Sequence, residues 1–554
     1  MDSLRIIQKD DRYDDDPDAR ASRIEQMDSI FGHAAVTFVA ADGLDAEAGL
    51  CGISTRPVRN QIARGIRPNV NVLLAVKYNN NYGKWDTRAW TLQEKLLSKQ
   101  MLIFNGGYVS YHCQHGVLRE DMPGYHAGCG PPQIPWVSSL PDDSGVSKIK
   151  RTWDGAPVLL RSPFFTEYAN LLAQYTGRDM TDSRDSLSAV MRLLKVLEKM
   201  ANTNRPRGTL GDPDTHAQSP LGYTLYGLPE KFLDLALLWH PPAAKGVHLT
   251  KREHDYLPSW SWTAWEIGKD PDYHPDTKKE YHTQPGVRFE EPFWVSTNDD
   301  LSLKKVIARN TSNKKPAEER FKPLVMWYRS SRPPLPQGTL RSSQNTAGLG
   351  NGPAREASLA LVPVSGHGLG LAFDPADEEK LRRFKEDAMK LRTNSSSNSP
   401  IDLGPPSIPA GIPIDNRHLV CETQVARFRL RETKPRQEIL WKPSTKGDQG
   451  LVVDTELIIP EAEILDSSDT VVGRVIPTDQ RKGLSSALYD FILLSESQYW
   501  GNEDRVDVSG LPLFNVMFVE WDTRGEFATR LGVGKVQKSA WWAAKPTKEV
   551  VILK

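Results

Sequence analysis

The segment RAWTLQEKLLSKQMLIFNGG, which begins at Arg88, constrains this chain more than any other. Positions four apart share one face of a helix, so a helix over residues 90–98 presents Glu94 one turn beyond Trp90. The apolar run over 100–105, ending before two glycines, predicts a strand. A carboxylate beside a large apolar ring is prepared for acid or charge-stabilising chemistry. In the alternative interpretation, the indole packs in the core and the acid only solvates the helix.

Helices and strands alternate in the first third of the chain, which favours an α/β sheet. A helix is predicted over 17–33 because Ile24, Met27 and Phe31 fall on one face. β-Branched and apolar runs predict further strands at residues 35–41, 69–78 and 109–113. We expect the helix that carries the indole and the acid to border a mostly parallel layer formed by these strands.

The middle of the chain is predicted to be helical. Residues 164–200 read as two helices, with Asp182 or Ser183 as the N-cap of the second. The second helix carries an apolar stripe that is typical of a core face, formed by Leu187, Val190, Leu194 and Leu197. A third helix is predicted over 229–240.

The sequence Pro-Ser-Trp-Ser-Trp follows at residues 258–262. Alternation places Trp260 and Trp262 on the same face of a strand. A core tryptophan cluster is favoured over a platform for a sugar or an aromatic ligand, and both interpretations stay open.

Short strands separated by proline and glycine turns dominate the last part of the chain. Residues 266–392 read as a mixed region with short strands, 393–415 as a flexible linker or loop, and 416–554 as a mainly-β C-terminal module, either a sandwich or a barrel. Gly532 and Gly534 lack the third glycine and the helix of a nucleotide-binding loop, so we do not interpret them as one.

Composition limits the partners and the compartment. The 554 residues carry 70 basic and 70 acidic side chains, so charge gives no reason to expect nucleic acid. The sequence contains no apolar run of about 18 residues, so no membrane span is expected. Four cysteines in so long a chain favour a reducing, cytoplasmic location. His112, Cys113, His115, His126 and Cys129 cluster in sequence, but their spacing matches no standard zinc site, and we expect no metal.

The segment that begins at Arg88 resembles the signature of the fungal heterokaryon-incompatibility (HET) domain. The residues that match this signature are Arg88, Trp90, Thr91, Gln93, Glu94, Leu97 and Ser98. The first residues resemble the family's Trp-x-Asp-x-x-Cys-Ile-x-Gln-Asp motif through Asp2, Ile6, Gln8 and Asp10, although Arg5 replaces the cysteine. The Pro-Ser-Trp-Ser-Trp sequence, and the C-terminal Arg530-Leu-Gly-x-Gly-Lys with Trp541, resemble other recurring features of HET-domain proteins.

This resemblance implies a partial HET domain over 1–130 and a helical region over 160–265 that ends in Pro-Ser-Trp-Ser-Trp. Members of the family open with a strand similar to Ala-Leu-Ser-Tyr-x-Trp-Gly, and no such segment precedes Met1, so we expect an N-terminally truncated domain. The family's distant relation to TIR domains implies an incomplete TIR-like, flavodoxin-like fold for the α/β region.

Three functions follow from the resemblance. The first is fungal non-self recognition and cell-death signalling through self-association or a protein partner, with no cofactor. The second is NAD cleavage, with NAD as substrate, in which Glu94 is catalytic and Asp2 is a residual acidic partner. In that hypothesis Trp90 supports the site by packing, and Arg88 contacts a phosphate or carboxylate. The third is an inert, truncated relative.

Overall fold

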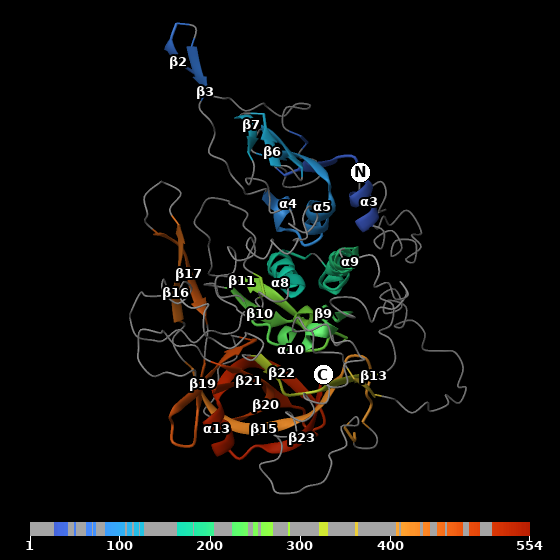
Figure 1. Ribbon diagram of the computed structural model, residues 1–554, viewed down its shortest axis with the longest axis vertical. Coiled ribbons are helices and arrows are strands. Elements are labelled where there is room, and N and C mark those ends of the chain that lie inside the picture. The colour runs from blue at the N-terminus through green and yellow to red at the C-terminus, as the bar shows by residue number, and fades with distance from the viewer. Residues whose placement is uncertain are drawn as a thin grey trace, which may run out of the picture.

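The structure is a computed structural model of the chain (Figure 1). The description that follows covers residues 27–41, 49–50, 63–68, 70–73, 83–105, 108–113, 116–120, 122–126, 163–180, 182–203, 224–241, 247–252, 256–269, 286–287, 321–330, 361–363, 406–408, 412–432, 436–443, 451–459, 462–479, 487–498 and 512–554. Most of the predicted linker over 393–415 lies outside these residues. Figure 1 shows the α/β part at one end of the long axis, a helical layer in the middle and a β module at the other end.

The α/β part contains a five-stranded sheet with the order β1-β4-β5-β6-β7. These strands are β1 (Thr37–Ala40), β4 (Gln100–Asn105), β5 (Tyr108–Cys113), β6 (Gly116–Arg119) and β7 (Met122–His126). Only β1 and β4 run parallel, and the three other pairs are antiparallel. The predicted mostly parallel layer is therefore wrong for the described strands. The physical reason is the two-residue connections from β4 to β7, which make hairpins, whereas a parallel pair needs a long crossover.

Three helices accompany this sheet: α3 (Met27–His33), α4 (Gly83–Thr87) and α5 (Thr91–Leu97). The predicted helix over 90–98 is confirmed as α5, and the predicted strand over 100–105 is β4. Helix α5 ends because Ser98 turns to an extended conformation and its hydroxyl donates to the Glu94 carbonyl at 2.6 Å. Of the predicted helix over 17–33, the part from Met27 is confirmed and the rest lies outside the described residues.

A second hairpin, β2 (Ala63–Arg67) with β3 (Val70–Leu73), is antiparallel and projects from the same end of the molecule (Figure 1). It confirms part of the strand predicted over 69–78. No helix in the described part of the chain is long and apolar enough to cross a membrane.

The middle layer is built on α8 (Pro163–Thr176) and α9 (Ser188–Thr203), which confirm the predicted helical pair. Residues 182 and 183 do not cap α9. They introduce a short 3-10 turn, η3 (Ser183–Asp185), in which the Asp185 amide donates to the Asp182 carbonyl at 3.0 Å. Three members of the predicted stripe are buried, namely Val190, Leu194 and Leu197.

The helix predicted over 229–240 is mostly wrong. The chain forms a small hairpin, β8 (Thr224–Leu225) with β9 (Leu228–Pro229), then a 3-10 turn, η5 (Glu230–Phe232), and one turn of helix, α10 (Leu233–Ala236). Residues 232–240 are all buried, so their apolar run reflects burial on every side and not the period of one long helix.

The predicted strand carrying both tryptophans is also wrong. Trp260 lies in a turn, while Trp262 begins a 3-10 turn, η6 (Trp262–Ala264), whose amide at Thr263 donates to the Ser261 hydroxyl at 3.1 Å. A strand starts only at β11 (Trp265–Lys269), which pairs with β10 (Val247–Lys251). The core interpretation is confirmed, because both indoles are at most 2% exposed.

The C-terminal module is mainly β, as predicted, and six of its strands close into an antiparallel barrel. They are β15 (Leu419–Glu432), β18 (Ala462–Leu465), β19 (Val471–Pro477), β20 (Leu488–Gln498), β21 (Pro512–Trp521) and β22 (Ala528–Gln537). The pairing of β15 with both β18 and β20 closes the ring. Phenylalanines fill the interior, and Trp541 of α13 (Lys538–Ala543) packs among them.

Further strands extend the barrel sheet. Strand β23 (Thr547–Leu553) pairs with the first half of β15, and β12 (Phe321–Pro323) pairs with β20. On the other side of β15 lie β13 (Trp327–Ser330) and β14 (Leu361–Pro363). A separate hairpin is formed by β16 (Arg436–Pro443) and β17 (Leu451–Ile459).

The barrel predicts a strong effect at Gly534, which lies in β22 and not in a nucleotide loop. A Cβ atom at this position would lie 2.2 Å from the Arg474 carbonyl oxygen in the adjoining strand. We expect Gly534→Ala to lower the free energy of unfolding by about 1–3 kcal/mol, because backbone atoms must shift. Thermal melting checks this against Gly32→Ala, where a Cβ atom meets nothing within 4 Å. Equal melting temperatures for Gly534→Ala and the wild type would contradict the close strand approach.

Candidate functional site

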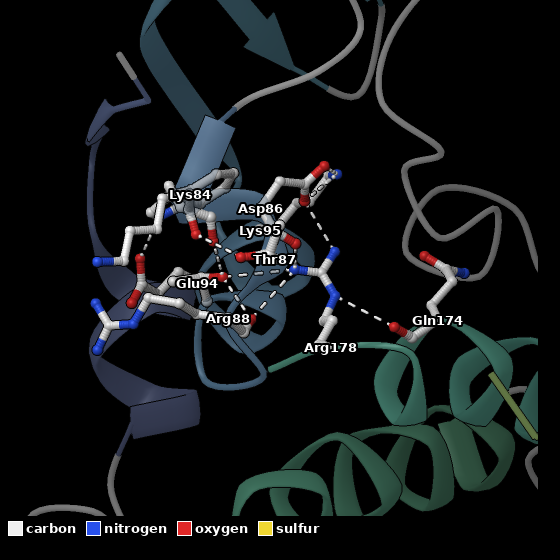
Figure 2. A network of polar contacts seen from close by, with 10 residues as sticks. Lys84, Asp86, Thr87, Arg88, Glu94, Lys95, Gln174 and Arg178 are labelled. Atoms are coloured by element: carbon white, nitrogen blue, oxygen red, sulfur yellow. Dashed lines mark hydrogen bonds and ion pairs between the residues drawn. The ribbon is translucent and has the colours of Figure 1, made fainter. Parts of the chain in front are cut away.

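The HET-like motif residues lie where the α/β part meets the helical layer. Arg178, just after α8, reaches toward the turn between α4 and α5 (Figure 2). Its guanidinium donates to the Asp86 carboxylate at 2.8 Å and to the Arg88 carbonyl at 3.3 Å, and it also bonds the Asp86 carbonyl. The same side chain donates to the Gln174 carbonyl at 3.2 Å, which fixes it to its own helix.

Lys95 of α5 completes a charged cluster with Asp86 and Arg178. Its ammonium lies 2.8 Å from the Asp86 carboxylate, and the Lys95 and Arg178 side chains are only 8% and 3% exposed. Burial opposes ionisation of Asp86, but Lys95 and Arg178 outweigh it and hold the carboxyl pKa below its usual value. Burial lowers the pKa of Lys95, against the pull of Asp86. The Asp86 carboxylate therefore forms ion pairs with two buried cations, Lys95 and Arg178.

Main-chain hydrogen bonds join the same two segments. The Ala89 amide donates to the Asp179 carbonyl at 2.9 Å, and the Asp179 amide donates to the Thr87 carbonyl at 2.6 Å. Gln93, which is fully buried, donates its side-chain amide to the Ala189 carbonyl in α9. The motif thus binds the helical layer through its backbone, one ion pair and one amide.

Glu94, the predicted catalytic acid, is half-buried in the first turn of α5. Its carboxylate accepts a hydrogen bond from the Trp85 indole at 2.9 Å. The indole that holds the acid is therefore that of Trp85 in α4, which sequence reasoning missed because it assigned the role to the residue four positions before the acid. Trp90 is half-buried and, like Leu97, packs against Met27 and Phe31 of α3.

The two remaining predicted site residues stand apart from these contacts. Arg88 has an exposed side chain, and its carbonyl accepts hydrogen bonds from Thr91 and Arg178. Asp2 lies outside the described residues, so its predicted partnership with Glu94 stays a prediction.

Several polar side chains lie on the buried face of the sheet. The sequence did not predict that they come together. Ser110 and His112, two positions apart on β5, share a face, and the Ser110 hydroxyl and the His112 Nε2 atom lie 2.8 Å apart. Both residues are buried, as are Asn105 and Arg119. Burial, with a smaller contribution from Lys95, lowers the pKa of His112 to about 4. The imidazole is therefore neutral near pH 7.

The predicted cysteine and histidine cluster does not come together as far as the structure describes it. His112 and Cys113 are consecutive on β5 and so point to opposite faces. His115 and Cys129 lie outside the described residues. No group of three metal-ligating side chains occurs among the residues described.

A second polar junction lies between the helical layer and the barrel. The fully buried Arg530 donates to the Leu237 carbonyl at 2.8 Å and to the Trp239 carbonyl, and it stacks 3.8 Å over the Trp239 ring. The Arg530 amide in turn donates to the Ser259 hydroxyl at 3.2 Å, and the Trp260 indole donates to the Arg417 carbonyl at 2.9 Å. The Pro-Ser-Trp-Ser-Trp segment and the segment that begins at Arg530, which both resemble features of the family, meet here. Their contacts indicate a structural junction.

The geometry therefore defines an α/β unit whose motif helix is bonded to a helical layer, with a β barrel on the far side of that layer (Figure 1). Residues 1–94 match the model of the family described as heterokaryon incompatibility protein (HET). This match over the first 94 residues confirms the resemblance that the motif indicated. No curated protein and no solved structure matches the chain.

The buried imidazole predicts a loss of stability in acid. Because the pKa of His112 in the folded chain is about 4, below the ordinary value of 6.5, its contribution is complete above pH 6.5 and is lost as the pH falls toward 4. We expect a loss of about 3 kcal/mol from this residue. The difference in melting temperature between pH 7 and about pH 4.5 should shrink in His112→Gln, whose amide still reaches Ser110. An unchanged difference would refute the assignment.

Proposed function

We propose that this protein is a fungal non-self recognition and cell-death signalling module that acts through self-association or a protein partner. The observation that carries the proposal is the family match over residues 1–94. We propose residues 1–130 as the signalling unit, 160–265 as its helical support and 416–554 as a separate mainly-β module, with 266–392 and the segment 393–415 between them. The four cysteines of the chain support a cytoplasmic location.

The motif has both buried and exposed side chains, and the exposed ones support association with another molecule. Thr91, Leu92 and Gln93 are buried and hold the helix in place. Arg88 is exposed, so its guanidinium is available to a carboxylate or a phosphate on a partner.

This proposal predicts that Arg88→Ala separates function from folding. We expect the free energy of unfolding to change by less than about 0.5 kcal/mol, because the side chain is exposed and only the main chain takes part in the motif network. Growth arrest on induced expression in a fungal host should be lost. Lys99→Ala, an exposed cation one residue beyond Ser98, is the matched control and should keep the arrest. Equal killing by both variants would exclude the proposed role of Arg88.

NAD cleavage is the second candidate, and one observation favours it. The Glu94 carboxylate is half-buried and is oriented by the Trp85 indole, as a group that stabilises a developing positive charge on ribose must be. A TIR-like arrangement for the α/β unit is part of this candidate, with NAD as substrate and no bound cofactor. The single parallel strand pair in the described sheet favours the association proposal over it.

The NAD hypothesis predicts that purified protein consumes NAD and that Glu94→Gln abolishes consumption. The amide oxygen of glutamine still accepts from the Trp85 indole, so the variant removes the charge and preserves the fold. Free nicotinamide, measured by chromatography over hours, reports the reaction. A folded wild-type sample that releases no nicotinamide excludes the enzyme, and cell killing without NAD loss leaves the association proposal in place.

A further inference from the structure

The contact between the motif segment and the helical layer carries an uncompensated polar group. Gln93 of α5 is 0% exposed and lies in the contact with α9. Its amide nitrogen bonds the Ala189 carbonyl, but no donor in the described part of the chain reaches its Oε1 atom. An unsatisfied buried acceptor of this kind works against the contact.

The charged part of the same contact also contributes little net stability. Arg178 and Asp86 are largely withdrawn from water, and the loss of hydration offsets most of the attraction in a buried pair. Asp86 has a second cation, Lys95, in its own segment. If Arg178 withdraws, the Asp86 carboxylate therefore keeps an ion-pair partner, and only the Asp86 and Arg88 carbonyls lose the donors that Arg178 supplies.

The internal bonds of the motif segment do not depend on the helical layer either. The Thr91 hydroxyl donates to the Trp85 and Arg88 carbonyls, and the Glu94 carboxylate accepts from the Trp85 indole. Trp90 packs on α3 as well as on the large core. If the two segments separated, the apolar face that carries Ala89, Leu92 and Leu96 would lose its cover, and the two main-chain hydrogen bonds to Asp179 would be lost.

From these contacts we infer that the interface between α5 and the α8–α9 pair is a releasable contact that masks the motif helix and opens without unfolding of the barrel. The interface combines an apolar face and two main-chain hydrogen bonds with an unsatisfied amide oxygen and an ion pair whose carboxylate has a second cation in its own segment. At the junction on the other side of the helical layer, the Arg530 Nε atom also lacks a partner within the described residues, but this buried guanidinium stacks on Trp239 and donates to two carbonyls of the helical layer. Separation there would leave Arg530 without these partners, whereas Asp86 keeps Lys95 at the motif contact, so we expect opening at the motif contact.

This inference goes beyond the proposed signalling function, because it concerns a conformational equilibrium that is measured in the purified chain without a partner, NAD or a cell. It assigns Gln93 and Arg178 opposite influences. Gln93 weakens the closed state through its unsatisfied oxygen, and Arg178 strengthens it by bridging α8 and the α4–α5 turn.

Native-state hydrogen exchange of the full chain tests the inference through two variants. Gln93→Met keeps the side-chain volume and removes the unsatisfied oxygen, while the Ala189 carbonyl keeps its place in the hydrogen bonding of α9. We expect the α5 and α9 amides to exchange about fivefold to tenfold more slowly, where tenfold corresponds to about 1.4 kcal/mol. We expect Arg178→Gln to exchange about tenfold faster in the same helices, with β20 and β21 unchanged.

Arg427→Gln is the matched control, because Arg427 forms an ion pair with Asp490 at 2.8 Å on the exposed side of the barrel, away from the motif. It should leave exchange in α5 and α9 unaltered. If Arg178→Gln fails to fold, slower exchange in Gln93→Met still supports the inference. Faster or unchanged exchange in Gln93→Met, or wild-type α5 and α9 amides that exchange only together with the barrel amides, would overturn it.

Discussion

The position of the motif helix depends on the guanidinium of Arg178. This single side chain bonds the Asp86 carboxylate, two carbonyls of the α4–α5 turn and a carbonyl of its own helix. Arginine suits this role because its planar donors satisfy several acceptors at fixed angles and its charge is retained when buried. A turn with two inward-facing carbonyls would otherwise leave acceptors without donors next to an apolar core.

One apolar core runs from the motif helix to the last strand. It includes Leu92 in α5, Leu193 in α9, Trp262 in η6 and Leu553 in β23. Two polar junctions interrupt it, one around Arg178 and one around Arg530, and each uses an arginine that bonds main-chain carbonyls. They differ in charge balance. Arg178 has a carboxylate partner, whereas Arg530 donates to main-chain carbonyls and stacks on an indole ring.

The sequence predicted elements well where one local signal decides the structure. The predicted bounds of helix α5 and strand β4 agree with the structure to within a residue, because the helical spacing, the apolar run and the following glycine pair all agree. The mainly-β end of the chain was recognised from its repeated turns. Local patterns failed in the buried run around α10 and at Trp260, where burial on all sides removes the periodicity that distinguishes a strand from a helix.

The site was predicted only in part, because its chemistry depends on contacts between distant segments. The motif named Glu94 and Arg88, but nothing local indicates that Trp85 holds the acid or that Arg178, about ninety positions away, holds the turn. The direction of the sheet was missed for the same reason, since pairing is a long-range property.

The motif residues divide into those whose side chains fold the helix and those whose side chains are exposed. The side chains of Thr91 and Gln93 form hydrogen bonds within the chain, and the exception is the Gln93 Oε1 atom. Arg88 contributes its carbonyl to the fold and presents its side chain to solvent. A sequence signature of this kind combines two constraints, the placement of a helix against its support and the presentation of a cation beside it. Both constraints meet in the same short turn, because Arg178 of the supporting layer donates to the carbonyl of the residue that carries the exposed cation.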